Sequence, residues 1–228
     1  MLGAIMYFLI WFPLNVLRRI YWRWAVDGLQ HVPPVGEGVI LAANHLNWLD
    51  ILVIGASLPL ARRPQWLAKA ELFKNPIVAW WLREMGCIAI QRGRRDLNAL
   101  NEAEEALKKG ALLIIFPEGH RSDTGGLIEG RGGAIRLAVN SGALIMPTAL
   151  HGTEQGVAGL MRRNQISIRF NRSYHPDVIG PTIPADKMRR LTTELMLQIA
   201  ELLPESYRGI YRELQDTRMR RQAVGAPE

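Results

Sequence analysis

Cysteine is almost missing from this sequence, and so are the patterns that hold structural metals. The single cysteine, Cys87, excludes an internal disulfide, and no cysteine or histidine set has zinc-ligand spacing, so we expect no metal. Cys87 lies in the apolar run 86–90, which favours a buried core thiol over a nucleophile. The motif Gly-x-Ser-x-Gly is also absent, which excludes the commonest serine-hydrolase route.

The first 17 residues lack charged side chains. Arg18, Arg19 and Arg23 follow at once, and Pro13 interrupts the apolar segment, which is too short and too broken to predict a membrane span. A secretory signal would carry its positive charge before the apolar stretch, and here the order is reversed. We interpret the segment as a retained membrane anchor, and its basic flank favours the cytoplasmic face of the membrane.

Tryptophan does not occur after residue 81. Indole rings prefer the headgroup depth of a bilayer, so we expect Trp11, Trp22 and Trp24, next to the apolar segment, to contact the membrane. Trp66, by contrast, is expected to fill the core. This asymmetry predicts one membrane-facing side of the molecule.

Acidic residues are outnumbered by basic ones. Lys and Arg total 28 against 21 Asp and Glu, which gives a net charge of +7 and a pI near 10.0. Such a surface favours anionic partners such as phospholipid headgroups, coenzyme A phosphates, an acidic carrier protein or nucleic acid. The basic residues are scattered and no nucleic-acid motif occurs, so we expect no nucleic-acid partner. Nothing in the sequence predicts an oligomeric state.

Short apolar runs bounded by turn residues predict buried strands, and helical patterns lie between most of them. The predicted strands are residues 39–43, 66–68, 87–91, 111–116, 144–150 and 165–170, and the clearest helices are 96–109, 131–141 and 185–203. The alternation of strands and helices predicts an α/β fold with a largely parallel central sheet flanked by helices.

A first candidate site, Asn-His-Leu-Asn-Trp-Leu-Asp at residues 44–50, directly follows the strand predicted at 39–43. The carboxyl ends of strands are where α/β folds place their sites. We expect His45 and Asp50 to meet around a strand-to-helix turn, with the carboxylate on one imidazole nitrogen. That bond would fix the tautomer and leave the other nitrogen free to act as a base. The pair alone is weak support and needs a second motif.

The second motif is Phe-Pro-Glu-Gly-His-Arg-Ser at residues 116–122, again at a strand end. Arg121 offers a planar donor fork for a phosphate, and Gly119 lets the backbone approach a ligand closely. Glu118 can bind a hydroxyl or hold the arginine in place. Taken alone, the stretch is also compatible with a surface turn that contains a salt bridge.

The two motifs resemble the first and third sequence blocks of the glycerolipid acyltransferase family, Asn-His-x4-Asp and Phe-Pro-Glu-Gly-Thr-Arg-Ser. Residues 86–92 are similar to the second block, which ends in an acceptor-binding arginine, here Arg92. Lys69, in Lys-Ala-Glu-Leu, matches a stretch before that block, and residues 145–148 resemble the proline-centred fourth block. The resemblance covers about residues 35–155.

The resemblance implies a domain plan and a reaction. A two-helix membrane-binding motif would occupy residues 1–34, the catalytic domain 35–204 and a basic tail 205–228. A fatty acyl group would pass from acyl-CoA or acyl carrier protein, without a cofactor, to the free hydroxyl of 1-acyl-glycerol-3-phosphate, giving phosphatidic acid in phospholipid synthesis. The expected catalytic residues are His45 and Asp50, and the expected substrate-binding residues are Lys69, Arg92, Glu118, Gly119 and Arg121.

One departure from the family pattern leaves the acceptor open, because His120 stands where the family has threonine. Glycerol-3-phosphate, another lysolipid or another amphipathic alcohol remain alternatives. Two other classes of function also remain. A hydrolase would use the same histidine and aspartate to activate water, and a non-catalytic basic protein would only bind membranes.

Overall fold

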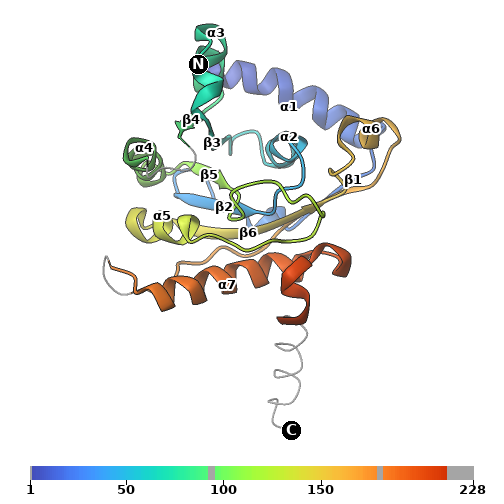
Figure 1. Cartoon of the computed structure of the whole chain (residues 1–228). Coiled ribbons are helices and arrows are strands. Elements are labelled where there is room, and N and C mark those ends of the chain that lie inside the picture. The colour runs from blue at the N-terminus through green and yellow to red at the C-terminus, as the bar shows by residue number, and fades with distance from the viewer. Residues whose placement is uncertain (1, 92–95, 179–181, 215–228) are drawn as a thin grey trace.

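The computed structural model describes residues 2–91, 96–178 and 182–214, which form a seven-stranded sheet between layers of helices (Figure 1). The strands are β1 Trp24–Asp27, β2 Val39–Ala43, β3 Pro64–Lys69, β4 Cys87–Ile90, β5 Leu112–Ile115, β6 Leu144–His151 and β7 Ile166–Phe170. The α-helices are α1 Leu2–Ile20, α2 Leu49–Ser57, α3 Pro76–Glu84, α4 Leu97–Lys108, α5 Gly133–Ser141, α6 Gly156–Met161 and α7 Ala185–Leu202.

The sheet has the strand order β1-β7-β6-β2-β5-β3-β4, and neighbouring strands are parallel except for the antiparallel pair β6 and β7. This confirms the predicted α/β fold with a largely parallel sheet. All the predicted strands are present, β2 with the predicted bounds. β1 was not predicted, because a four-residue pattern is too short to distinguish a strand from a continuation of the preceding helix.

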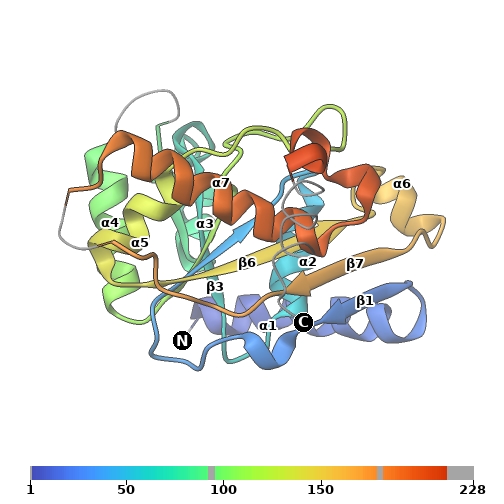
Figure 2. The same ribbon diagram turned by 90° about the horizontal axis from the view of Figure 1, so that it is seen from below.

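Strand β2 is buried on both faces, because helices cover both sides of the sheet. Ile40 and Ala42 belong to the core cluster shared with α4, α5 and α7, whereas Val39, Leu41 and Ala43 pack with residues of α2. Figure 2 shows α7 lying across the face of the sheet. A central strand with two buried faces has an uninterrupted apolar sequence, which is the pattern that predicted it.

Helix α1 is joined to the end of α2 by three polar side chains spaced four residues apart. The Tyr7 hydroxyl donates to the Gly55 carbonyl (2.8 Å), Trp11 Nε1 to the Leu58 carbonyl (3.0 Å) and Asn15 Nδ2 to the Ala56 carbonyl (2.8 Å). These carbonyls belong to the last turn of α2 and its cap, where intrahelical partners are missing. The bonds satisfy them and fix one face of α1 against the domain.

The opposite face of α1 is apolar and exposed. By length and composition the helix could also cross a membrane. The tryptophans expected to contact the membrane, Trp11, Trp22 and Trp24, are half-buried, and this contact stays a prediction. The indole nitrogens of Trp11 and Trp24 donate to the Leu58 carbonyl and to Ser57 Oγ at the end of α2. The exposed large side chains on α1 are Leu2, Ile5, Phe8, Leu9, Phe12, Val16, Leu17 and Ile20.

The N-terminal range 1–34 differs from the two-helix motif that the resemblance implies. In the described part of this range, α1 is its one α-helix, and β1 then joins the sheet beside β7. The predicted tail differs as well, because residues 205–211 form two 3-10 turns that bury Tyr211. Residues 215–228, with the basic residues expected there, lie outside the described residues.

Candidate active site

Three neighbouring strands, β5, β2 and β6, bring the candidate residues to one edge of the sheet. Their carboxyl ends are adjacent because the strands are parallel. The segments that follow them, which begin at residues 44, 116 and 152, therefore converge. Asn44 ties two of these strands together, since its side-chain amide exchanges two hydrogen bonds of 2.9 Å with the backbone of Leu150.

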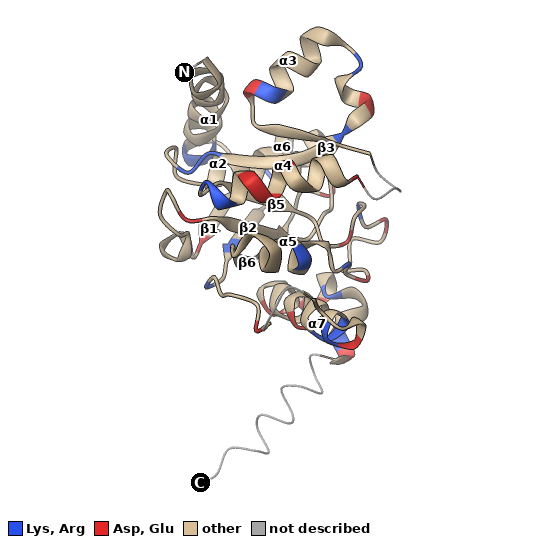
Figure 3. Cartoon of the chain, turned by 90° about the vertical axis from the view of Figure 1, so that its left-hand side faces the viewer, with Lys and Arg blue, Asp and Glu red and all other residues tan. Residues whose placement is uncertain are grey.

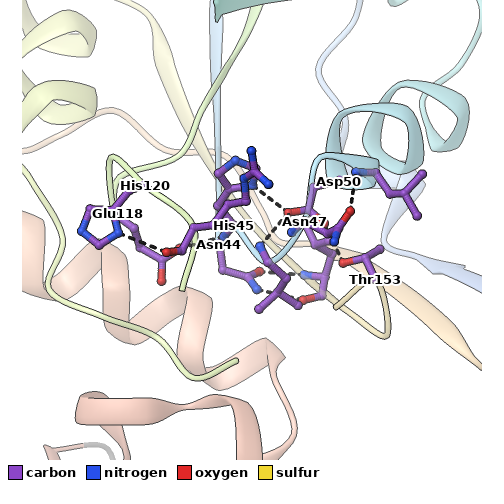
Figure 4. Close-up of polar contacts among 11 residues, drawn as sticks. Asn44, His45, Asn47, Asp50, Glu118, His120 and Thr153 are labelled. Atoms are coloured by element: carbon purple, nitrogen blue, oxygen red, sulfur yellow. Dashed lines mark hydrogen bonds and ion pairs between the residues drawn. The ribbon is translucent and has the colours of Figure 1, made fainter. Parts of the chain in front are cut away.

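The predicted contact between His45 and Asp50 is present (Figure 4). His45 Nδ1 lies 2.7 Å from Asp50 Oδ2, which also accepts the backbone N–H groups of Leu46 (2.6 Å) and Asn47 (2.8 Å). Asp50 is fully buried in the first turn of α2. Because a carboxylate accepts, Nδ1 carries the proton, and Nε2 keeps its lone pair.

The rest of His45 is held by the segment after β5. Its ring stacks on Phe116 with centroids 4.0 Å apart, and its carbonyl accepts the Ser122 N–H at 2.9 Å. Its own N–H donates to Glu118 Oε2 at 2.7 Å. The two sequence motifs are therefore joined through the peptide groups of a single histidine.

The Glu118 carboxylate is buried and faces backbone groups of the candidate site. The carboxylate is 1% exposed and accepts N–H groups from His45 and, at 3.1 Å, from Ile128. Burial raises the pKa of Glu118 to about 7, although both N–H groups act in the opposite direction. Each carboxylate oxygen accepts one backbone N–H group, which gives Glu118 a structural role, and its expected contact with the acceptor stays a prediction.

Gly119 is required at its position for two reasons. Its φ is 77°, which other residues rarely adopt, and an added Cβ would lie 3.2 Å from Arg131 Nε. His120 is exposed, and its Nδ1 lies 3.1 Å from the Arg121 carbonyl. The structure does not place the His120 ring among the side chains that line the cavity described next.

Lys69 and Arg121 share the lining of one cavity with His45. Its volume is about 390 Å³, and apolar side chains of α1, α2, β3 and α3 form most of its wall. Arg92 lies outside the described residues, so its predicted role stays a prediction. The lining residues used below are Tyr7, Trp11, Trp48, Gly55, Ala56 and Trp81.

The cavity extends away from the catalytic pair along α2. Trp48, just before this helix, and Gly55, near its end, both line the cavity, and seven residues of helix span about 10 Å. His45, Lys69 and Arg121 all follow or end strands at the carboxyl edge of the sheet, so the polar groups gather at the Trp48 end. The cavity thus has a cationic head and an apolar body.

Thr153 also belongs to the site, although the sequence did not single it out. Its hydroxyl donates to Asp50 Oδ1 at 2.6 Å, and the residue is completely buried. The two residues are separated by 103 positions. No local pattern links them, and only the placement of β6 beside β2 could have indicated the contact.

Comparison with known families supports the resemblance drawn from the two motifs. The family model described as Acyltransferase matches residues 23–151, more than half of the chain. The chain belongs to the acyltransferase family. A 1-acyl-sn-glycerol-3-phosphate acyltransferase of Pseudomonas aeruginosa is 30% identical over 187 residues, which cover 80% of this chain and 71% of that protein.

Other members of the acyltransferase family are longer. A chloroplastic 1-acyl-sn-glycerol-3-phosphate acyltransferase of Arabidopsis thaliana is 28% identical over 73% of this chain and 47% of its own length. This chain therefore spans about half the length of that relative. A lyso-ornithine lipid O-acyltransferase of Pseudomonas aeruginosa is 32% identical over 53% of this chain and 46% of its own length.

A solved acyltransferase has the same fold. The crystal structure of the 1-acyl-sn-glycerophosphate (LPA) acyltransferase PlsC from Thermotoga maritima superposes with a TM-score of 0.65 and 24% identity, covering 87% of this chain and 79% of that one. His45, Asp50, Glu118 and Arg121 lie inside the acyltransferase match, whereas Thr153 lies just beyond it.

Proposed function

We propose that this chain is an O-acyltransferase that moves a fatty acyl group from acyl-CoA or acyl carrier protein to the free hydroxyl of 1-acyl-glycerol-3-phosphate. The product would be phosphatidic acid, an intermediate of phospholipid synthesis. The observation that supports this most directly is the hydrogen-bonded pair of His45 and Asp50 at the cationic head of an apolar cavity. The names of several relatives point to the same reaction.

In the proposed step His45 Nε2 takes the proton of the acceptor hydroxyl as its oxygen attacks the thioester carbonyl. The C–S bond breaks, and the thiolate leaves and takes up a proton from the imidazolium, so transfer is direct and no acyl-enzyme forms. Asp50 holds the ring in the correct tautomer and stabilises the imidazolium. A general base supplies about 10²- to 10⁴-fold, and positioning of the substrates must add to this.

The acceptor phosphate would lie against the cationic head. Lys69 and Arg121 line the cavity beside His45, and the guanidinium fork of Arg121 suits two phosphate oxygens. Gly119 and Arg92 remain proposed contacts of the same group. Glu118 supports this site indirectly, by holding the His45 peptide.

The acyl chain would occupy the apolar body of the cavity between α1 and α2. Burial of methylene groups favours binding by about 0.8 kcal/mol each, so a dry apolar pocket provides much of the donor affinity. Gly55 and Tyr7, where α1 meets α2, line the part far from His45. The depth of the cavity at this point would set the preferred chain length.

The membrane would contact the exposed apolar faces of α1 and α3. Figure 3 shows both helices almost free of charge along their length. Arg18 and Arg19 follow the apolar part of α1, and the exposed apolar side chains on α3 are Ile77, Val78, Trp80 and Trp81. This arrangement suits the anionic, cytoplasmic face of a phospholipid membrane, with the helices lying at the interface.

The decisive experiment measures transfer from one acyl-CoA and one acyl carrier protein to a panel of acceptors, with mass analysis of products. The panel contains lysophosphatidate, glycerol-3-phosphate and, given the relatives, lyso-ornithine lipid. We expect phosphatidic acid, and a loss of at least about 10²-fold in His45→Ala. His175→Ala, at an exposed histidine, is the matched control and should keep full activity.

The same assay separates transfer from hydrolysis. Thiol release that needs no lipid acceptor would identify a hydrolase, and full transfer activity in a folded His45→Ala protein would remove the proposed base. Circular dichroism of both variants confirms that they are folded.

A further inference from the structure

The two oxygens of the Asp50 carboxylate accept different numbers of hydrogen bonds. Oδ2 accepts the imidazole and two backbone N–H groups, whereas the Thr153 hydroxyl is the one donor to Oδ1 among the hydrogen bonds of the described residues. Asp50 and Thr153 are both 0% exposed, so solvent does not reach this oxygen. We infer that Thr153 is a positioning residue that acts on His45 through Asp50.

The reason lies in how a carboxylate can move. Its two oxygens are chemically equivalent, so a half turn about the Cβ–Cγ bond would only exchange them, but a smaller rotation would move Oδ2 out of line with the N–H groups of Leu46 and Asn47. Oδ2 would then leave the imidazole, and the tautomer of His45 would no longer be fixed. The 2.6 Å bond from Thr153 opposes this rotation, because turning the carboxylate would leave a buried hydroxyl and a buried oxygen unpaired.

The segment that carries Thr153 is itself fixed. Gly152 has a φ of 89°, and a Cβ there would overlap the Gln165 carbonyl, so the turn after β6 tolerates only glycine. Glu154 then accepts the Gly152 N–H at 2.9 Å and the Tyr207 hydroxyl at 2.8 Å. The 3-10 turn after α7 thus braces the Thr153 segment from a distant part of the chain.

The same turn also supports the other half of the site. The Tyr207 carbonyl accepts the Leu127 N–H at 2.9 Å, and the next residue, Ile128, donates to Glu118. Residues 205–211 therefore hold both the segment that fixes Asp50 and the segment that fixes the His45 peptide. The bracing turn itself lies beyond residue 151, where the family match ends, whereas Leu127, Ile128 and Glu118 lie inside the match.

The test compares Thr153→Val, which removes the hydroxyl at nearly constant volume, with Thr153→Ser, which keeps it. We expect kcat to fall roughly 10- to 100-fold in the valine variant, with KM for donor and acceptor unchanged, because a hydrogen bond to a charged group is lost. Thr153→Ser should restore most of kcat. Thr192→Val is the matched control, since this buried hydroxyl donates only to a carbonyl of its own helix.

A second measurement does not depend on activity, although the role of His45 as base rests on the proposed function. Nitrogen NMR of the imidazole should show one tautomer in the wild type and the serine variant, protonated at Nδ1, and a mixture in Thr153→Val. A single wild-type tautomer together with wild-type kcat in the valine variant would overturn the inference. If the wild type transfers no acyl group but the tautomer still changes, the proposed function fails and the positioning inference stands.

Folding of the valine variant is checked by circular dichroism before either comparison. If it does not fold, Thr153→Ala replaces it, because alanine removes the same donor without adding volume. We expect the alanine variant to show the same loss of kcat and the same mixture of tautomers as the valine variant. Wild-type kcat together with a single tautomer would again overturn the inference.

Discussion

The two ends of the candidate site are held together by different kinds of interaction. At the polar end each carboxylate oxygen of Asp50 and Glu118 accepts at least one N–H or O–H group in a buried place. At the other end the cavity and the outer faces of α1 and α3 are apolar, and large side chains such as Phe12 and Trp80 are exposed. Directional bonds fix the candidate catalytic groups, whereas the apolar end depends on shape and burial. Substitutions should therefore have abrupt effects at one end and graded effects at the other.

The largest expected effect comes from Glu118→Gln. This substitution should change how the free energy of unfolding depends on pH. Because burial raises the pKa of Glu118 from 4.5 to about 7, the folded state binds a proton more tightly than the unfolded state. This contribution to stability is complete below pH 4.5 and is lost as pH rises through 7, a change of about 3 kcal/mol. The test measures the free energy of unfolding of both proteins with urea at each pH. The value for the wild type minus the value for Glu118→Gln should fall by this amount between pH 4 and pH 8.

Glu129→Gln provides the control for this measurement, because Glu129 is an exposed carboxylate in the same part of the chain. The difference in unfolding free energy between the wild type and Glu129→Gln should change little between pH 4 and pH 8. Parallel pH profiles for the wild type and Glu118→Gln would show that the buried carboxylate does not titrate as described.

A smaller and more selective effect is expected at the apolar end from Gly55→Leu. A Cβ at Gly55 has room, with Tyr7 atoms at 3.9 Å, but a leucine side chain would fill the part of the cavity far from His45. We expect the kcat/KM ratio of long-chain to short-chain acyl-CoA to fall roughly 10- to 100-fold, since pocket contacts of this kind differ by 1–3 kcal/mol.

The control for chain length is Gly133→Leu, at a position where no atom lies within 4 Å of an added Cβ. It should leave the ratio unchanged. An unaltered chain-length preference in Gly55→Leu would mean that the acyl chain does not reach this part of the cavity.

The smallest expected effect concerns the membrane face. Phe12 is 52% exposed on α1, and replacing it with serine should weaken binding to anionic phospholipid vesicles about tenfold, as expected from burial of part of an aromatic ring. Leu97→Ser changes a residue that is 54% exposed on α4, and it should bind as the wild type does. Equal losses in both variants, measured by vesicle sedimentation, would argue against α1 as the membrane face.

The fold was largely predictable because its central strands, such as β2, are buried on both faces. Residues 39–43 and 111–116 have uninterrupted apolar sequences, and the helices between strands show clear periodicity. The His45–Asp50 contact was predictable as well, since a short turn at a strand end limits where the two side chains can lie.

Two features of the site were not predictable, for different reasons. The motif predicts that Glu118 lies at a strand end, but its inward direction depends on N–H groups of His45 and Ile128 that only the folded chain supplies. The Thr153 contact joins segments that are far apart in sequence. Local sequence patterns therefore predict the candidate base, His45, more readily than the residues that hold it in place.

The bonds from Tyr7, Trp11 and Asn15 to the end of α2 make the first helix part of the lipid pocket as well as of the outer surface. Cutting residues 1–20 away to obtain a freely soluble enzyme would remove one wall of that pocket. The carbonyls of Gly55, Ala56 and Leu58 would at the same time lose the donors that this helix supplies. In this molecule the first helix and the rest of the domain are a single folding unit, and neither can be engineered as a detachable module.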